Sequence, residues 1–438
     1  MTCSRHRTSR TFQIRAFLAA LALSALSLHA QTNVATIAPV EAKPVTILPP
    51  AMTGDWGGWR TKLADYGFNL QVFLTGMLQG QAGGTDDSDD INELTERGTG
   101  RGPFVAGRVD ALFELDTAKM GLWPGGSVHG HAEVEFGEVP GWSGGSLWPV
   151  NTAAITPLVD PGQVSLTSLF YRQRISDTTF MAGKINALDL LARDPFFGGW
   201  GIERFQNLAL VANPNGITQL VMLGGSIDQK IGDFNLTALV FDPNNRTENT
   251  FDRVFQDGVN FNFSAQWNGK VWDRPSNLGV SYSFSTEQSV NLEDIYLAST
   301  GVVTSRNSPD SFGLRFGHQL WASPVRPGKG IGLYGRAAAT QGSPNPIQWS
   351  IAGGITGEGM WASRKWDSFG VGIYHYGWSQ GLSTALLTDV GPETGFEVFY
   401  NFAVTPWLIV TPDIQVIAPA TAEADVFAVL GLRTVVKF

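Results

Sequence analysis

The sequence predicts an all-β protein, a transmembrane antiparallel β-barrel of about sixteen strands with a short N-terminal helix and long extracellular loops. Three observations support this prediction. The chain begins with an export signal, and no later apolar run approaches the ~20 residues that a spanning helix needs. From Phe68 onward, apolar and polar residues alternate with a period of two. Since only helices and closed barrels satisfy backbone polar groups in lipid, a membrane protein of this pattern must be a barrel.

Residues 1–30 are expected to be a secretory signal peptide. Four arginines precede the uncharged apolar run from Ala16 to Leu28, and Ala30 provides a small residue for cleavage. A buried N-terminal helix is the alternative. The chain's one cysteine, Cys3, lies in this segment, so the remainder offers no disulfide or thiol chemistry. Removing the segment moves the net charge from −9 to −13, which argues against nucleic acid as a partner.

Two segments lie between the signal and the first strand. Residues 31–50 hold four prolines and no hydrophobic period, which indicates an extended periplasmic lead-in. Residues 51–67 predict a short amphipathic helix. Asp55 can cap its start, Gly67 suits its end, and one face repeats at helical spacing in Trp56, Trp59, Leu63 and Tyr66, with Arg60 between them.

Residues 68–438 are expected to form the outer-membrane barrel. Alternation is clearest at 256–268, where small uncharged polar residues occupy one face and Phe261, Phe263 and Trp267 the other. A soluble β-sandwich is the alternative, but strands of ten or more residues are longer than the soluble norm of about 5–6. Fourteen or eighteen strands are also possible. The predicted strands are 68–83, 103–119, 126–138, 164–176, 178–187, 218–226, 232–242, 256–268, 276–288, 310–321, 330–341, 346–357, 367–378, 392–403, 406–418 and 425–438.

The connections between these strands differ in length. Short turns are expected near Thr405–Pro406 and Asp273–Ser276, whereas 84–102, 139–163, 187–217 and 288–309 are long, as extracellular loops tend to be. The last strand alternates up to a terminal aromatic, Phe438, which resembles the signal that barrel-assembly machinery recognises. We therefore expect that machinery and outer-membrane lipid as partners.

Three blocks of sequence resemble the carbohydrate-selective porin family of the OprB type. They are Gly54-Asp55-Trp56-Gly57-Gly58-Trp59-Arg60 through Gly67; Gly183 to Asp189 through Phe205-Gln206-Asn207; and Tyr400-Asn401 with Thr405 to Leu408, Thr411 to Gln415, Gly431 to Arg433 and Phe438. The resemblance implies a sixteen-stranded outer-membrane porin that passes small sugars such as glucose by passive diffusion. It also implies that the N-terminal helix lies at the periplasmic side. A general small-solute porin is the alternative function.

Charged residues recur at positions expected to face the lumen. Such side chains order water and can hydrogen-bond sugar hydroxyls. The alternative is that they hydrate the wall and anchor loops. These candidate pore-lining residues are Arg108, Asp110, Glu114, His129, His131, Glu133, Glu135, Arg172, Arg174, Lys184, Arg315, Arg336 and Glu397. Loop aromatics Trp142, Trp148 and Trp200 are candidates for stacking on a sugar ring.

No cofactor, metal or catalytic site is expected. The cluster His129, His131, Glu133 and Glu135 has ligand types that zinc accepts, but a lumen-facing ladder predicts the same pattern. Gly141 to Gly145 matches G-x-S-x-G around Ser143, yet it lies in a Gly-rich loop without the strand and helix that a nucleophile elbow needs. An outer-membrane barrel hydrolase is therefore the less favoured alternative. Asp86 to Asp90 form an acidic loop tip that we interpret as solvated rather than calcium-binding.

Overall fold

The computed structural model describes residues 50–84, 102–137, 146, 148–156, 161–191, 202–212, 217, 219–247, 251–294, 306–342, 345–386, 390–420 and 424–438. The chain separates into two units, Met1–Val45 and Thr46–Phe438, and the described residues all belong to the second. The predicted signal peptide, nearly all of the lead-in, Ser143 and the Asp86 to Asp90 tip lie outside the described residues.

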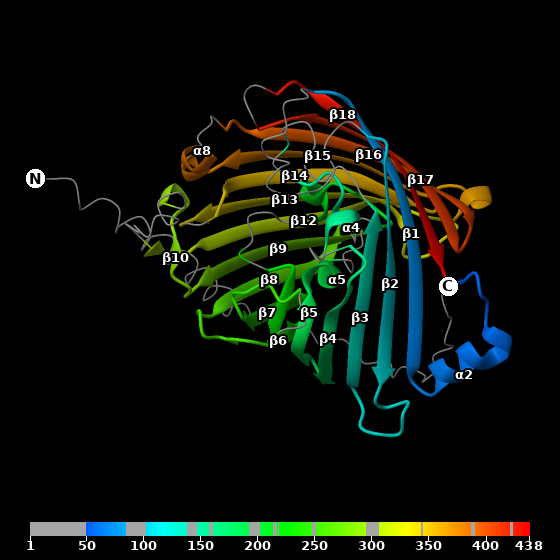
Figure 1. The fold of residues 1–438 in the computed structure, drawn as a ribbon. Coiled ribbons are helices and arrows are strands. Elements are labelled where there is room, and N and C mark those ends of the chain that lie inside the picture. The colour runs from blue at the N-terminus through cyan, green and yellow to red at the C-terminus, as the bar shows by residue number, and fades with distance from the viewer. Residues whose placement is uncertain are drawn as a thin grey trace, which may run out of the picture. The chain divides into compact units, whose positions relative to one another are not determined.

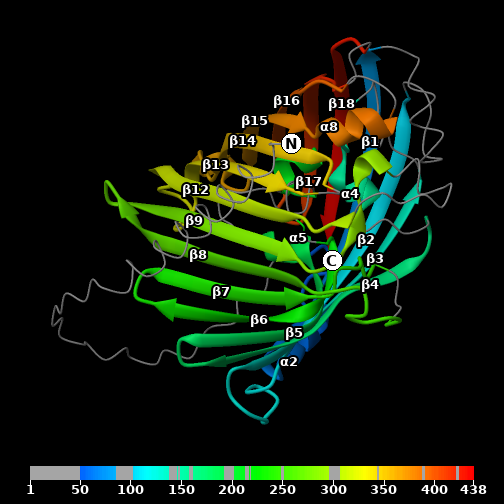
Figure 2. The ribbon, with the colours of Figure 1, turned by 90° about the vertical axis from the view of Figure 1, so that its left-hand side faces the viewer.

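Within the described residues, sixteen antiparallel strands close into one barrel (Figures 1 and 2). Each strand pairs with its neighbours along the chain, and β1 pairs with β18 to complete the wall. The barrel strands are β1 (Phe68–Gly83), β2 (Phe104–Asp116), β3 (Gly126–Gly137), β4 (Val164–Ile175), β5 (Thr178–Asn186), β6 (Val221–Ile231), β7 (Phe234–Phe241), β8 (Asn260–Val271), β9 (Arg274–Ser285), β12 (Asp310–Ala322), β13 (Gly330–Gln341), β14 (Ile347–Glu358), β15 (Ser368–Trp378), β16 (Glu393–Thr405), β17 (Leu408–Ala418) and β18 (Phe427–Lys437).

All sixteen predicted strands are confirmed; 68–83 and 330–341 have the predicted bounds, and the others have shifted ends. The largest shifts concern the predicted segments 218–226 and 256–268, which are β6 and β8. β6 continues to Ile231 because Asp228 and Gln229, although polar, pair with both β5 and β7, and Lys230 pairs with β7. β8 continues to Val271 because it forms a tight hairpin with β9 through Trp272 and Asp273, both at positive φ. Ser289–Val290 (β10) and Arg306–Asn307 (β11) form a separate two-stranded sheet.

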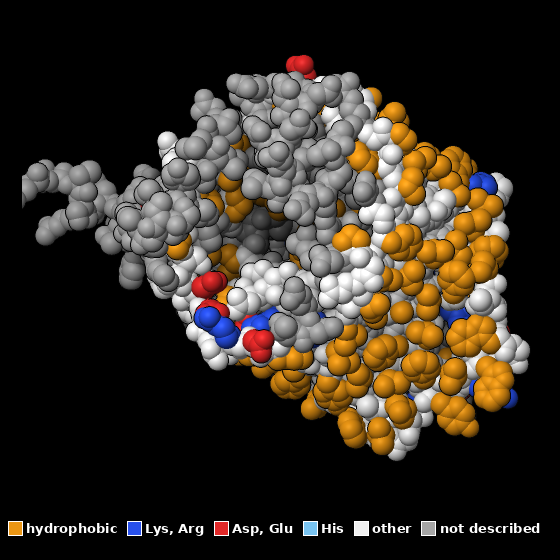
Figure 3. All heavy atoms as spheres, in the orientation of Figure 1, with side chains coloured by type: hydrophobic (Ala, Val, Ile, Leu, Met, Phe, Trp, Pro, Cys, Tyr) orange, Lys and Arg blue, Asp and Glu red, His pale blue; other side chains and the backbone are white. Residues whose placement is uncertain are grey.

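The two faces of the wall differ as the alternation predicts. On β1, Leu74 and Leu78 point outward and are 37% and 44% exposed, whereas Thr75, Met77 and Gln79 point inward and are buried. Hydrophobic side chains cover the outward surface over the first strands (Figure 3). Apolar side chains in such numbers on an exterior surface are typical of a wall that faces lipid.

Short connections gather at one end of the barrel, which we call the turn end. Two-residue turns join β4 to β5, β6 to β7 and β8 to β9. The predicted N-terminal helix is α2 (Trp59–Asp65), preceded by a 3₁₀ turn, η1 (Trp56–Gly58), and it lies at the same end. Asp55 does not cap α2 directly, because Gly57 and Gly58 take positive φ and Gly58 becomes the N-cap. Instead, an Asp55 carboxylate oxygen accepts from the Thr61 backbone N–H at 2.8 Å.

The opposite end carries the long connections, which contain η2 (Leu292–Asp294) and α8 (Gln380–Leu386), while η3 (Ala362–Arg364) lies in the β14–β15 connection at the turn end. Two of the long connections enter the barrel. The first holds α4 (Thr152–Ile155), and the second holds α5 (Ala187–Leu191) and α6 (Leu208–Val211). All four residues of α6 are buried, three of them completely. We call residues 148–156 and 202–212 the inserted segments. None of the described helices is long and apolar enough to cross a membrane.

Candidate functional site

The first inserted segment is bound by a buried ion network on β2 and β3, which we call the Arg108 cluster: Arg108, Asp110, His131, Glu133 and Glu135. Antiparallel pairing sets Arg108 opposite Glu135 and Asp110 opposite Glu133, all on the inward face. The Arg108 guanidinium lies 2.9 Å from an Asp110 oxygen and 2.6 Å from a Glu133 oxygen. These side chains are almost fully buried, so the carboxylates depend on the charged and polar groups around them, Arg108 first and His131 beside it, instead of on water.

The Arg108 cluster reaches both long connections. Arg108 Nη1 donates to the carbonyl oxygens of Ala153 and Thr156, at 2.9 and 3.0 Å, where α4 ends. His131 places one ring nitrogen 3.2 Å from Asp110 and the other 3.0 Å from Asp189 of α5. The cluster therefore fastens α4 and α5 to the wall.

The same cluster contains the types of residue that ligate metals. One oxygen or nitrogen each from Asp110, His131 and Glu133 lies within 4.8 Å of the others. However, Arg108 already contacts Asp110 and Glu133 and supplies the positive charge that a cation would bring. The arrangement therefore fits an ion-pair network better than a metal centre.

The second inserted segment is bound on the other side of the barrel seam by Glu397 of β16. Its two carboxylate oxygens accept from the backbone N–H groups of Gln206 and Asn207, at 2.5 and 2.9 Å. Arg433 of β18 donates to the Arg204 carbonyl at 2.9 Å, and Asn401 donates to the Glu203 carbonyl at 2.6 Å. Glu397 is 1% exposed, so no water replaces these contacts if they are lost.

Shape as well as charge fixes this segment. On β15, a Cβ added to Gly372 would lie only 2.9 Å from both Leu210 Cδ1 and Phe205 Cε1, so a glycine is needed for the close approach. Tyr376 donates its hydroxyl to the Ala209 carbonyl at 2.7 Å, and Arg336 donates to the same oxygen. Asn207 caps α6 by accepting from the Ala209 N–H at 2.9 Å. The segment is packed against the wall along its length.

The remaining candidates do not join these clusters. Arg174 is exposed at the turn end and donates to Ser176, while His129 stacks on Phe170 with ring centroids 4.9 Å apart. Lys184 is buried and donates to the Thr247 carbonyl at 3.4 Å. Glu114 and Arg172 are half-buried on β2 and β4. Of the loop aromatics, Trp148 packs against Tyr376 and Trp378, and Trp142 and Trp200 lie outside the described residues.

Sequence reasoning missed several residues that position the inserted segments. These include Asn207, Gly372 and Tyr376, which carry no charged side chain, and Asp189, whose carboxylate lies on α5 instead of on a strand. The signals available were the Asn207 cap before Leu208 to Val211 and the glycines at inward positions of β15. Neither signal shows against which strands of the barrel the second inserted segment packs.

A family model described as "Carbohydrate-selective porin, OprB family" matches residues 100–438. The chain belongs to this OprB family. It is an outer-membrane porin for carbohydrates, as the sequence predicted. The fold agrees with the high-pH structure of Pseudomonas putida OprB, with a TM-score of 0.74 at 20% identity over 89% of this chain and 99% of that one. The low-pH structure gives 0.56 at 16% identity, over 89% and 98%. Comparison with curated sequences finds no match.

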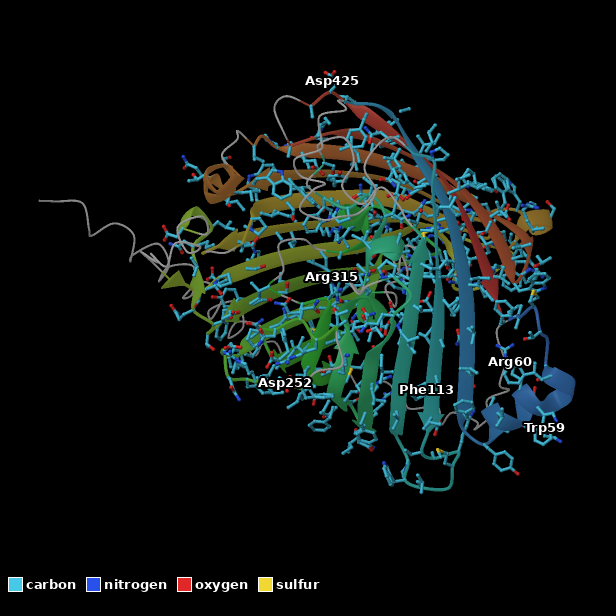
Figure 4. All side chains as sticks on the ribbon, in the orientation of Figure 1. Trp59, Arg60, Phe113, Asp252, Arg315 and Asp425 are labelled. Carbon is cyan, nitrogen blue, oxygen red and sulfur yellow. The ribbon has the colours of Figure 1, made fainter. Side chains whose placement is uncertain are left out.

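In this OprB-family barrel, the inner face of β8, β9 and β12 differs from the inner face that the inserted helices contact. It presents amides and hydroxyls, and at its middle stands one guanidinium, that of Arg315, which is exposed and donates to Gln266 (Figure 4). The inserted helices lie against β2, β3, β5, β14 and β15. The polar side chains of the wall include Asn262, Ser264, Gln266, Asn268, Asn277, Ser281 and Ser283.

Proposed function

We propose that sugars diffuse passively along the inner face of β8, β9 and β12, while the inserted segments narrow the other side of the lumen. The observation that carries this proposal is a difference in exposure. Arg108, Arg336 and Glu397 are at most 6% exposed and bound to inserted segments, whereas Arg315 is exposed. The buried residues thus shape the path, and Arg315 is positioned to contact what passes.

The chemistry of this wall suits a neutral polyol. Amides and hydroxyls both donate and accept, so a sugar can exchange its hydrogen bonds with water for bonds with the partly exposed Asn262, Gln266 or Ser281. Conduction requires that each of these contacts be weak enough to release the solute. Arg315 adds donors that can bind two hydroxyls of one sugar ring, which would favour carbohydrates over solutes that lack vicinal hydroxyls.

Three half-buried candidates and the exposed Arg174 take a secondary role in this proposal. Glu114, His129, Arg172 and Arg174 lie on strands next to the turn end, where they would meet a sugar after it passes the inserted segments. Lys184 is 5% exposed and would hold the β7–β8 connection through its hydrogen bond to Thr247 instead of contacting solute.

Current block by a sugar tests the role of Arg315. We expect glucose to block single-channel current in the native protein and Arg315→Gln to weaken the apparent affinity about three- to thirtyfold, the effect of losing roughly 0.7–2 kcal/mol of hydrogen bonding. Lys329→Gln, a cation in the β12–β13 turn, is the control and should not change it. Equal affinities in all three proteins would contradict the proposed path. Liposomes that do not swell in sugar would contradict carbohydrate transport itself.

We also propose that β18 carries the signal for barrel assembly. Phe438 extends the strand, and its backbone N–H donates to the Val72 carbonyl at 2.8 Å. Phe438→Ser should lower the yield of folded protein in the outer membrane, whereas Leu432→Ser, which removes a lipid-facing side chain from the same strand, should lower it less. Similar yields for the two variants would remove the special role of Phe438.

We propose further that the barrel has no hydrolytic activity. This proposal rests on the sequence context of Ser143, a Gly-rich connection instead of a strand-to-helix turn. Ester and peptide substrates should remain intact with the purified porin. Cleavage that disappears in Ser143→Ala would establish the hydrolase alternative.

A further inference from the structure

The turn end carries a patch of large apolar side chains that no part of the described chain covers. We call it the rim patch: Trp59, Tyr66, Met120, Leu122 and Trp123. Their side chains are 63%, 74%, 47%, 58% and 50% exposed. Trp59 and Tyr66 belong to the helical face that the sequence pattern marked as apolar, and one would expect such a face to pack against protein. Here it does not, so the patch needs an explanation of its own.

The two parts of the rim patch are held together, because α2 is hydrogen-bonded to the end of β2 and to the β2–β3 connection. Lys119 donates its ammonium to the Ala64 carbonyl at 3.1 Å, and the Asp116 N–H donates to the Gly67 carbonyl at 2.8 Å. A Cβ on Gly67 would lie 3.1–3.2 Å from Lys119 and Met120, which shows how closely the helix end meets the connection. Both parts of the patch therefore move together.

The patch continues the lipid-facing surface of the wall. Tyr66 and Gly67 join α2 to β1, and Leu70 of β1 pairs with Phe113 of β2 on the outward face. Figure 4 shows Phe113 and Trp59 at the same end of the barrel. Trp123 extends the surface toward β4 through its indole N–H, which donates to the Tyr171 hydroxyl at 2.7 Å. The exposed apolar side chains of α2 thus lie at the same end of the barrel as the outward side chains of β1 and β2.

The helix has the three-sided character of one that lies in a membrane surface. One side packs on the barrel, where Arg60 is 7% and Ala64 1% exposed. A second side carries Thr61 and Asp65 and is polar and exposed. The third side carries Trp59 and Tyr66, whose rings combine an apolar body with a polar edge and are enriched where lipid meets water. Lys62 lies 5.0 Å from the Trp59 ring centroid, which places a cation beside the ring.

We propose that the rim patch is embedded in the headgroup layer of the periplasmic leaflet, so that α2 anchors the barrel to a phospholipid surface. The occupant is the leaflet itself, because the patch continues a surface that already faces lipid and carries Lys62 toward phosphate groups. The inference concerns the outside of the barrel and does not depend on the path that sugars take.

Site-directed spin labelling can measure this immersion. Since Cys3 is the only cysteine, a Cys3→Ser background allows single labels at Tyr66→Cys in the patch, Asp65→Cys on the polar side, and Leu78→Cys on the lipid-facing wall. In vesicles of phosphatidylethanolamine and phosphatidylglycerol, we expect collisions with oxygen relative to a water-soluble nickel complex to be severalfold higher at position 66 than at 65. The value at 66 should lie between those at 65 and 78, as expected for a site at headgroup depth.

A second measurement avoids a label at the patch. Trp59→Phe should reduce the fluorescence quenched by phospholipids brominated near the headgroup, whereas Trp148→Phe, in an inserted segment, should leave it unchanged. Aqueous accessibility at position 66 equal to that at 65 would overturn the proposal. Spin–spin broadening at position 66 that grows with protein density would also overturn it, since it would show a second copy of the chain on the patch.

Discussion

The two hydrogen bonds that Glu397 accepts from the second inserted segment give the sharpest prediction for the pore. Glu397→Gln retains one carbonyl oxygen, so it can satisfy only one of the two N–H groups of Gln206 and Asn207 and turns an NH₂ donor toward the other. At 1% exposure, water cannot compensate. A hydrogen bond to a charged group is worth about 1.5–3 kcal/mol. Its loss should therefore lower the preference for the inserted arrangement roughly ten- to a hundredfold.

Conductance and solute size report that change. We expect Glu397→Gln to show larger and noisier single-channel currents than the native protein, and its liposomes to admit tri- and tetrasaccharides at higher rates. Glu358→Gln is the matched control, because Glu358 pairs with Arg326 and Lys329 in the β12–β13 turn and forms no ion pair with the described residues of either inserted segment. A folded Glu397→Gln barrel with native conductance and native size limit would refute the view that this carboxylate anchors the constriction.

Three further variants probe the same construction. Arg108→Gln removes the guanidinium that pairs with the buried carboxylates of Asp110 and Glu133. It should lower the unfolding free energy by about 3–5 kcal/mol, seen as earlier urea unfolding in detergent, whereas Arg174→Gln should not. Gly372→Ala should displace Leu210 and cost about 1–3 kcal/mol by the same assay, against no change for Gly391→Ala, whose added Cβ meets its nearest neighbour at 3.7 Å. Burial alone would raise the pKa of Glu203, but Lys437, Arg204 and Arg433 leave that pKa lowered. The Glu203–Lys437 attraction is therefore complete above the unfolded pKa of about 4.3 and is lost as the pH falls through the lower folded value, so current noise should rise on acidification in the native protein and not in Glu203→Gln.

The strands could be predicted because each encodes its own faces. In β8, the outward Phe263 and inward Asn262 and Ser264 alternate, and that information lies within twelve residues. The period of two fixes the face of the sheet on which each side chain lies. The segment 400–438, which resembles a known family, agrees with that assignment. Strand ends were less certain, since pairing with neighbours, as at Asp228 to Lys230, decides where a strand stops.

The inserted segments could not be predicted in the same way. Residues 139–163 and 187–217 were interpreted as extracellular loops from their length alone. Their placement depends on contacts between distant residues, such as Asn207 with Glu397, 190 positions apart. The alternation along each strand predicted that Arg108 and Glu397 face inward. It cannot distinguish a charged side chain that contacts solute from one that binds a loop.

The contacts of the inserted segments suggest why closure and constriction belong together. Asn151 donates to Gln79 of β1 at 2.7 Å, and Arg433 of β18 donates to Arg204. These two strands meet only when the first and last parts of the barrel pair. Since the segments bind on both sides of that seam, their full set of bonds forms only after closure. A barrel that has not yet closed would lack the hydrogen bonds that hold the inserted segments inside it. Once formed, these bonds to β1 and β18 in turn stabilise the pairing of the two strands.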